Sequence, residues 1–177
     1  LMDDDLPERD KFRQDLESMR SLVQEGVSYA RTLQGSTEAE RRVDVAALIQ
    51  SIVNDYADTG QPVTLCGDAG EPIASRPNAL RRVVGNLVDN ALKFGPPGQT
   101  VRLIVDRVDS RARLAVEDQG PGIPVMDRSR IWSPYVRLRR EKSVAHEGSG
   151  IGLAVVRELT ALHRGEAYVE EAAGGGA

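Results

Sequence analysis

The stretch from Arg76 to Phe94 constrains the fold most, because its side chains separate into an apolar face and a polar face at helical spacing. With about 100° of rotation per residue, one broad arc holds Leu80, Val83, Val84, Leu87, Val88 and Ala91. A narrow arc on the other side holds Arg82, Asn86, Asn90 and Lys93, with Asp89 beside them. This pattern predicts a helix with Pro77 in its first turn that buries its apolar face against a sheet and displays the polar row away from it.

Composition narrows the class of protein. At 177 residues and 40% hydrophobic content, the chain is long enough for one domain with a real core plus an appendage. Its 27 acidic against 23 basic residues, with no sustained basic stripe, argue against nucleic acid as a partner. Cys66 is the single cysteine, which favours a reducing, intracellular setting. No apolar run approaches the roughly 20 residues that cross a bilayer, so we expect no membrane contact by this stretch of chain.

Residues 10–33 predict a helix of a different kind. Apolar or small residues recur there at alternating steps of four and three, at Phe12, Leu16, Met19, Val23, Gly26, Ala30 and Leu33. This heptad spacing is typical of a helix that buries its seam against other helices, in a coiled coil or a four-helix bundle. A helix packed on its own domain is the alternative reading.

Local signals place the elements between these two helices. Residues 34–42 are polar and lack periodicity, which predicts a linker. Asp44 is placed to cap a helix over residues 44–58, whose expected buried face consists of Val45, Leu48, Ile49 and Ile52. Short strands are predicted for PVTLCG and EPIAS, at residues 62–67 and 71–75.

The second half of the chain alternates strands, a long loop and a helix. TVRLIVDRV and RARLAVED predict a hairpin closed near Asp109 and Ser110. Residues 119–148 are rich in Gly, Pro and charge and too long for an ordinary connection, which predicts a functional loop. A helix over residues 149–163 and a strand over GEAYVEE, residues 165–171, complete the expected elements.

The polar row of the 76–94 helix suits a metal-bound phosphate. The amide oxygens of Asn86 and Asn90 are hard, neutral ligands, and Mg²⁺ that carries nucleotide phosphates needs only one or two protein ligands. Lys93 lies one turn further along and is a point charge within reach of the same phosphates. Taken alone, an Asn-x-x-x-Asn pair is more often a solvated polar face.

Two glycine motifs favour a phosphate-binding role for this face over a merely solvated one. DQGPGI, residues 118–123, follows a predicted strand, so the Asp118 carboxylate can face a pocket and accept from the amino group of an adenine. GSGIGL, residues 148–153, opens the next helix and leaves backbone N–H groups available to phosphate. A simple Gly-Pro-Gly turn remains an alternative for the first. The second is not a dinucleotide fingerprint, because Leu153 stands where that needs glycine.

In this order and spacing, the motifs resemble those of the ATP-binding domain of sensor histidine kinases, in the group shared with gyrase, Hsp90 and MutL. RRVVGNLVDNALKFG resembles the N box, DQGPGI the first glycine box and GSGIGLAVVREL the second. IWSPYVR resembles the F box, with Trp132 and Tyr135 in the aromatic places. The likeness covers residues 44–171.

The resemblance implies an α+β fold: a two-layer α/β sandwich of the Bergerat type, with a mixed sheet and ATP under a mobile lid. It divides the chain into residues 1–36, the second helix of a dimerisation hairpin, and residues 37–177, a catalytic domain that lacks its last strand. It also implies an ATP-dependent protein-histidine kinase, a transferase of two-component signal transduction.

The resemblance assigns roles by position. Asn86 and Asn90 serve Mg²⁺, and Asn86, Lys93 and Arg137 serve phosphoryl transfer. ATP binding is assigned to Asn86, Asn90, Lys93, Phe94, Asp118, Gly120, Gly122, Ile123, Gly148, Ser149, Gly150, Ile151, Gly152 and Leu153. Arg137 could equally belong to a solvated charged loop.

Position 86 separates the alternatives. ATP-hydrolysing relatives carry there a glutamate that activates water, whereas the Asn86 carboxamide cannot accept a proton. This favours a kinase over a gyrase- or Hsp90-like ATPase switch, and the intact motifs disfavour a nucleotide-binding pseudokinase module.

The family's phosphoacceptor motif is absent. His163 is followed by Arg164, and His146, although Glu147 follows it, stands in the predicted loop and not on a helix. His146 is expected to be a solvated loop residue, and His163 to satisfy carbonyls at a helix end. We therefore expect a fragment of a cytoplasmic kinase region, anchored to the membrane elsewhere in its parent. Its expected partners are ATP, a second copy through the N-terminal helix, and a response regulator.

Overall fold

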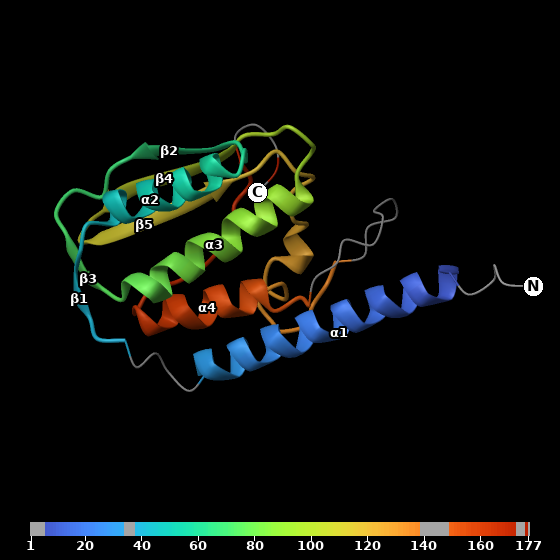
Figure 1. Ribbon diagram of the computed structural model, residues 1–177. Helices are drawn as coiled ribbons and strands as arrows, with labels where there is room; N and C mark the ends of the chain where they lie inside the picture. The colour runs from blue at the N-terminus through green and yellow to red at the C-terminus, as the bar shows by residue number, and fades with distance from the viewer. Residues whose placement is uncertain (1–5, 34–37, 139–148, 173–175, 177) are drawn as a thin grey trace, which may run out of the picture.

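A computed structural model of the chain describes residues 6–33, 38–138, 149–172 and 176. A layer of helices lies over one face of a sheet, and a long N-terminal helix runs along the outside (Figure 1). The helices are α1 (Leu6–Leu33), α2 (Val45–Asp58), α3 (Pro77–Phe94) and α4 (Gly152–Leu162). The strands are β1 (Arg41–Val43), β2 (Val63–Gly67), β3 (Ile73–Ser75), β4 (Val101–Val108) and β5 (Arg111–Glu117). The predicted α+β class is confirmed.

The main sheet is mixed, as predicted, with the order β2-β4-β5. β2 runs parallel to β4, and β4 pairs antiparallel with β5 in the expected hairpin. Asp109 at the hairpin tip adopts a positive φ of 55°, a conformation that aspartate tolerates better than most residues. α2 and α3 pack on this sheet, whose central strand is fully buried at Val101, Leu103 and Val105.

Two predictions about extended segments are wrong. The expected linker does not reach residue 42, because Arg41–Val43 forms β1 and pairs antiparallel with β3. Residues 165–171 form no strand, although their side chains alternate: no backbone hydrogen bond joins them to β5. Both errors have one cause, because strand formation depends on a neighbour that is distant in sequence and invisible to local alternation.

α2 is placed as predicted. The Asp44 carboxylate accepts from the backbone N–H of Ala47 at 2.9 Å, which caps the helix. Val45, Ile49 and Ile52 are buried on the sheet as expected, whereas Leu48 is half-buried.

α3 begins with a cap that the sequence does not reveal. Its N-cap residue, Arg76, makes no side-chain capping bond. Instead the Glu38 carboxylate accepts from the backbone N–H groups of Asn78 and Ala79, at 3.0 and 3.1 Å. A carboxylate at this end also complements the positive pole of the helix dipole. The segment that precedes β1 is thereby fixed to the start of α3.

His163 has the predicted role at the end of α4. Its Nδ1 lies 2.7 Å from the carbonyl oxygen of Leu159, and its Nε2 accepts from the backbone N–H of Arg76 at 3.2 Å. It therefore links the end of α4 to the start of α3. His146 lies outside the described residues.

α1 shows its apolar seam to solvent. Phe12, Leu16, Met19 and Val23 are between 50 and 65% exposed. The C-terminal end of α1 contacts α4, and there Thr32 is buried and Tyr29 packs against the core. Within the described residues, no helix combines the length and apolarity needed to cross a membrane.

Candidate nucleotide-binding site

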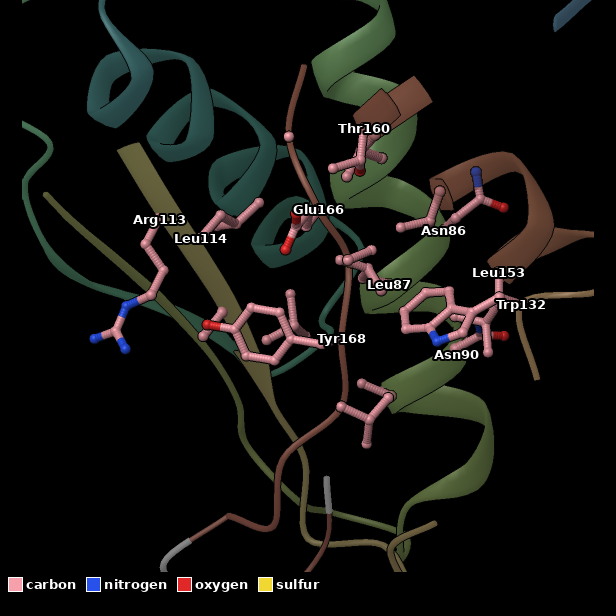
Figure 2. Close-up of a pocket in the computed structure, with 18 of the residues that line it drawn as sticks. Asn86, Leu87, Asn90, Arg113, Leu114, Trp132, Leu153, Thr160, Glu166 and Tyr168 are labelled. Carbon is pink, nitrogen blue, oxygen red and sulfur yellow. The ribbon is translucent and has the colours of Figure 1, made fainter. Parts of the chain in front are cut away.

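α3 has the two faces that the sequence predicts. Val84 and Val88 are fully buried against the sheet, and Ala91 is 3% exposed. Asn86 and Asn90 lie on a different face, toward a large cavity (Figure 2). The helix therefore packs its apolar stripe in the core and presents its polar stripe to the cavity.

Asn86 and Asn90 form the asparagine row of α3, which lies against the start of α4. The Asn86 amide nitrogen donates to the carbonyl oxygen of Arg82 at 2.8 Å. Its Oδ1 would lie 3.0 Å from a Cβ on Gly152, and the Asn90 amide nitrogen would lie 3.8 Å from that Cβ. A side chain at position 152 would therefore press on the asparagines, which explains why glycine opens this helix.

The N-terminus of α4 offers donors to an anion. Its N-cap residue, Ile151, makes no side-chain capping bond, and a helix N-terminus presents backbone N–H groups that suit an anion. The preceding Gly150 has a φ of 74°, and a Cβ there would lie 2.9 Å from the carbonyl oxygen of Val136. The backbone N–H of Tyr135 donates to Gly150 O at 3.0 Å. The predicted F box and second glycine box therefore pack on each other.

The aromatic residues of the predicted F box have different positions. Trp132 is 8% exposed and packs with Ile131 and Val155 in a buried apolar cluster between α3 and α4. Tyr135 is 66% exposed and has a φ of 63°, which is uncommon for an aromatic residue. Trp132 therefore holds the loop to the domain, and Tyr135 lies on its outer surface.

Asp118 begins the loop after β5, and residues 118–123 are called the Asp118 loop below. Its Oδ1 accepts from the backbone N–H of Gly120 at 2.7 Å. A Cβ on Gly120 would lie 2.8 Å from that same oxygen and 3.3 Å from the carbonyl oxygen of Phe94. Gly122 has a φ of 67°. Glycines at these positions let the loop turn tightly on the end of α3 and keep the carboxylate at the cavity.

The end of α3 carries a cation beside an aromatic ring. Lys93 Nζ lies 5.4 Å from the centroid of the Phe94 ring, within the range of a cation–π contact. Lys93 is half-buried, and Phe94 is 44% exposed. Both line the cavity, so a flat ring and a positive charge are available at one wall of it.

One cavity of about 2580 Å³ brings most of the predicted site residues together. It is lined by Asn86, Asn90, Lys93, Phe94, Asp118, Gly120, Gly122, Ile123, Arg137, Ser149, Gly150, Gly152 and Leu153. Ile151 is not among them: its side chain is 2% exposed and packs in the core with Val83 of α3. Gly148 lies outside the described residues.

The cavity is larger than the 300–1,000 Å³ of a usual small-molecule site. The additional volume extends along β5 to residues 165–172, where Glu166 and Tyr168 lie opposite Arg113 and Leu114 (Figure 2). This part lies between β5 and the segment that was expected to be a strand. The predicted site residues occupy the other part, between α3, α4 and the Asp118 loop.

Three structural contacts around the site correspond to no sequence motif. Tyr56 of α2 donates to Asp89 Oδ1 at 2.6 Å, beside the asparagine row. Burial, the hydrogen bond to Asp89 and the charge of Asp89 together raise the pKa of Tyr56 well above its ordinary value. The other two are the Glu38 cap and the buried Gln99 amide, which joins α3 to the loop of Asp118. All three link residues at least eight positions apart, so no local pattern reveals them.

Asn86 and Asn90 would offer amide oxygens to a divalent cation. Among the described residues, no group of three or more His, Cys, Asp or Glu side chains could hold a metal ion. Asn86 and Asn90 therefore fit Mg²⁺ only in the form predicted, in which phosphate oxygens and water supply the remaining ligands.

Known proteins are similar to this chain in sequence. A sensor histidine kinase of Pseudomonas aeruginosa, GtrS, is 34% identical over 168 residues, which cover 95% of this chain and 34% of GtrS. The adaptive-response sensory kinase SasA of a Synechococcus species is 33% identical over 174 residues, which cover 93% of this chain and 45% of SasA. The chain thus spans between a third and a half of the length of these relatives.

Solved structures agree. Full-length ShkA in complex with AMPPNP superposes with a TM-score of 0.74 at 25% identity, over 99% of this chain and 37% of ShkA. The ATP-binding domain of PrrB from Mycobacterium tuberculosis gives a TM-score of 0.62 at 26% identity, over 78% of this chain and 92% of that domain.

The sequence model of one family covers α3, α4, β4 and β5, which supply much of the cavity wall. It is described as "Histidine kinase-, DNA gyrase B-, and HSP90-like ATPase" and matches residues 75–177, more than half of the chain. With the motifs gathered at one cavity and relatives named as sensor histidine kinases, the chain belongs to this family of ATP-binding domains.

Proposed function

We propose that this chain is the ATP-binding catalytic part of a two-component sensor histidine kinase, and that it transfers the γ-phosphoryl group of ATP to a histidine. The observation that carries the proposal is the meeting of the asparagine row of α3, the Asp118 loop and the glycine start of α4 at one cavity. GtrS and SasA are named as sensory kinases, and ShkA binds the ATP analogue AMPPNP, which supports ATP as the ligand.

The adenine would bind at the end formed by β5 and α3. The Asp118 carboxylate accepts from the adenine amino group, and the exposed face of Phe94 stacks on the base. Gly120 and Gly122 keep this wall free of side chains that would displace a flat ring.

The phosphates would bind next to the base, between the polar side chains of α3 and the start of α4. Lys93 and Arg137 line the cavity and supply positive charge, and the first N–H groups of α4 supply hydrogen-bond donors. Mg²⁺, held by the amide oxygens of Asn86 and Asn90, would neutralise phosphate charge. These residues position the triphosphate and stabilise its charge, which is the main contribution of a protein to phosphoryl transfer.

Asn86 favours a kinase over an ATPase. A carboxamide cannot take a proton from water, and its nitrogen is engaged with the Arg82 carbonyl. Water is therefore poorly activated, and bound ATP persists until a nucleophile arrives. In the transfer, an imidazole nitrogen forms a bond to the γ-phosphorus. The bond between the γ-phosphorus and the β–γ bridging oxygen breaks, and ADP leaves.

The acceptor and partners lie outside this stretch of chain. We propose an acceptor histidine on a helix that pairs with α1, dimerisation of two copies through the exposed seam of α1, and relay to an aspartate of a response regulator. A cytoplasmic location, in the cytosolic part of a membrane-anchored sensor, follows from the same proposal.

Two measurements test the function. Calorimetry should show binding of ATP that tightens with Mg²⁺, and labelled ATP mixed with this chain and a separate histidine-bearing hairpin should yield an acid-labile phosphohistidine. No binding of Mg²⁺–ATP would overturn the proposal. Rapid hydrolysis of ATP by the chain alone, without transfer, would favour an ATPase switch instead.

A further inference from the structure

Gln99 is a buried amide that joins two walls of the candidate site. It is 5% exposed, one of four buried polar residues among those that the structure describes. Its Nε2 donates to the carbonyl oxygen of Ala91 in the last turn of α3. Its Oε1 accepts from the backbone N–H of Gln119, next to Asp118, at 2.8 Å. Gln99 does not line the cavity, so it would act through the residues that it holds.

Gly95 shows that the chain makes room for this amide. Gly95 has φ −81° and ψ 171°, an extended conformation that any residue adopts. A Cβ there, however, would lie 1.8 Å from Gln99 Nε2 and 2.2 Å from Gln99 Cδ. Glycine is therefore required at position 95 by the passage of the Gln99 side chain and not by the backbone.

The Asp118 loop meets the same junction from the other side. A Cβ on Gly120 would lie 3.3 Å from the carbonyl oxygen of Phe94 and 3.5 Å from the Cα of Gly95. The loop thus rests on the end of α3, and Gln99 lies in the interior of this contact. Two glycines and one buried amide define how far Asp118 stands from α3.

We infer that Gln99 is a positioning residue that sets the preference of the site for adenine. The inference rests on the proposed function. The amino group of the base is bound by the Asp118 loop and the phosphates by α3, and Gln99 fixes one element relative to the other. A hydrogen bond weakens steeply when its distance and angle depart from their narrow optimum, so a displaced Asp118 loses the adenine contact while Lys93 and Asn90 keep theirs.

The direct test replaces Gln99 with methionine, which has a similar volume and no amide. ATP and inosine triphosphate distinguish the two ends of the site, because inosine has a carbonyl where adenine has its amino group. We expect ATP affinity to fall about tenfold, as for the loss of one well-placed hydrogen bond, with little change for inosine triphosphate. Gln50→Met, in the exposed Gln50–Asn54 pair of α2, is the matched control and should change neither affinity.

A second test uses Gly95 and does not depend on how Gln99→Met folds. Gly95→Ala places a Cβ where the Gln99 amide lies and should reduce the ATP preference to a similar degree. In a Gln99→Ala background the space is open, so adding Gly95→Ala should have little further effect. Such non-additivity is the signature of two residues that act through one contact. Independent, additive losses would overturn the inference.

A readout without nucleotide separates this inference from the proposed function. Amide hydrogen exchange of Gln119 should be faster in Gln99→Met and in Gly95→Ala than in the unchanged chain. If the unchanged chain does not bind ATP, the proposed function fails, whatever the exchange data show. If it binds ATP and the variants keep the full preference for ATP over inosine triphosphate, Gln99 is structural only and the inference fails, even if the variants melt at lower temperature.

Discussion

α3 and α1 are both amphipathic helices, yet the structure uses their faces in opposite ways. α3 buries Val84 and Val88 completely and leaves its asparagines at a cavity, whereas α1 exposes Phe12 and Val23 by 65% each. In α3 the polar stripe carries the proposed function, and the apolar stripe packs in the core. In α1 the apolar stripe is itself available for binding, which agrees with a heptad seam that needs another helix. The same kind of pattern therefore means different things depending on what covers it.

The largest difference should appear when one charge is placed in each apolar stripe. Val88→Asp puts an unpaired carboxylate in the fully buried core and should destabilise the domain by more than about 4 kcal/mol, enough to unfold it. Val23→Asp, at an exposed position of α1, should leave the melting temperature nearly unchanged and reduce self-association instead. Thermal denaturation and sedimentation measure the two effects. Equal destabilisation by both variants would show that the α1 seam is part of the core.

The second prediction concerns the wall opposite the polar stripe of α3. Asp118→Ala removes the acceptor proposed for the adenine amino group, and hydrogen bonds to charged groups contribute about 1.5–3 kcal/mol. ATP affinity should therefore fall between about tenfold and a hundredfold, measured by calorimetry with circular dichroism as the check on folding. Unchanged affinity in a folded variant would show that the base is bound elsewhere.

The third prediction tests the polar stripe itself. Asn90→Ala removes an amide oxygen proposed for Mg²⁺ and should lower ATP affinity about tenfold, the effect of one such ligand. The loss should appear with Mg²⁺ present and be small when the metal is chelated. Asn54→Ala, on the exposed face of α2, is the control. Equal losses with and without Mg²⁺ would argue against a metal role for Asn90.

The smallest effect is expected at the contact between α2 and the polar stripe. Tyr56→Phe removes the hydrogen bond to Asp89 and should cost about 1 kcal/mol of unfolding free energy. Because the pKa of Tyr56 is raised in the folded domain, the stability that this tyrosine contributes is fully present below its ordinary pKa near 10 and declines as the pH rises above it. Denaturant titrations from pH 8 to 11 should show this decline in the parent chain and a smaller one in Tyr56→Phe. Identical pH profiles would exclude this role for Tyr56.

Local patterns were sufficient for the elements that carry the site. Three predictions each depend on the sequence of a single segment, and all are confirmed: the two-faced spacing of α3, the Asp44 cap and the hairpin tip at Asp109. The positions of Asn86, Asn90 and Asp118 at one cavity were expected from motif order and resemblance.

Contacts between distant segments were not predictable in the same way. Pairing of β1 with β3 joins residues at least thirty positions apart, and Glu38 caps a helix forty positions further on. Residues 165–171 alternate like a strand but have no ladder to β5. Ile151 lies between two glycines of a binding motif, and only the packing of α4 on α3 places its side chain in the core. Propensity describes one segment, whereas these outcomes depend on two.

The central claim is that the polar face of α3 and the Asp118 carboxylate bind the two ends of one nucleotide. A crystal structure of this chain with Mg²⁺ and a non-hydrolysable ATP analogue tests it most directly. We expect the adenine amino group within hydrogen-bonding distance of Asp118 and the phosphates beside Asn90 and Lys93. An analogue bound away from this cavity, or one in the cavity with its phosphates directed away from α3, would contradict the account.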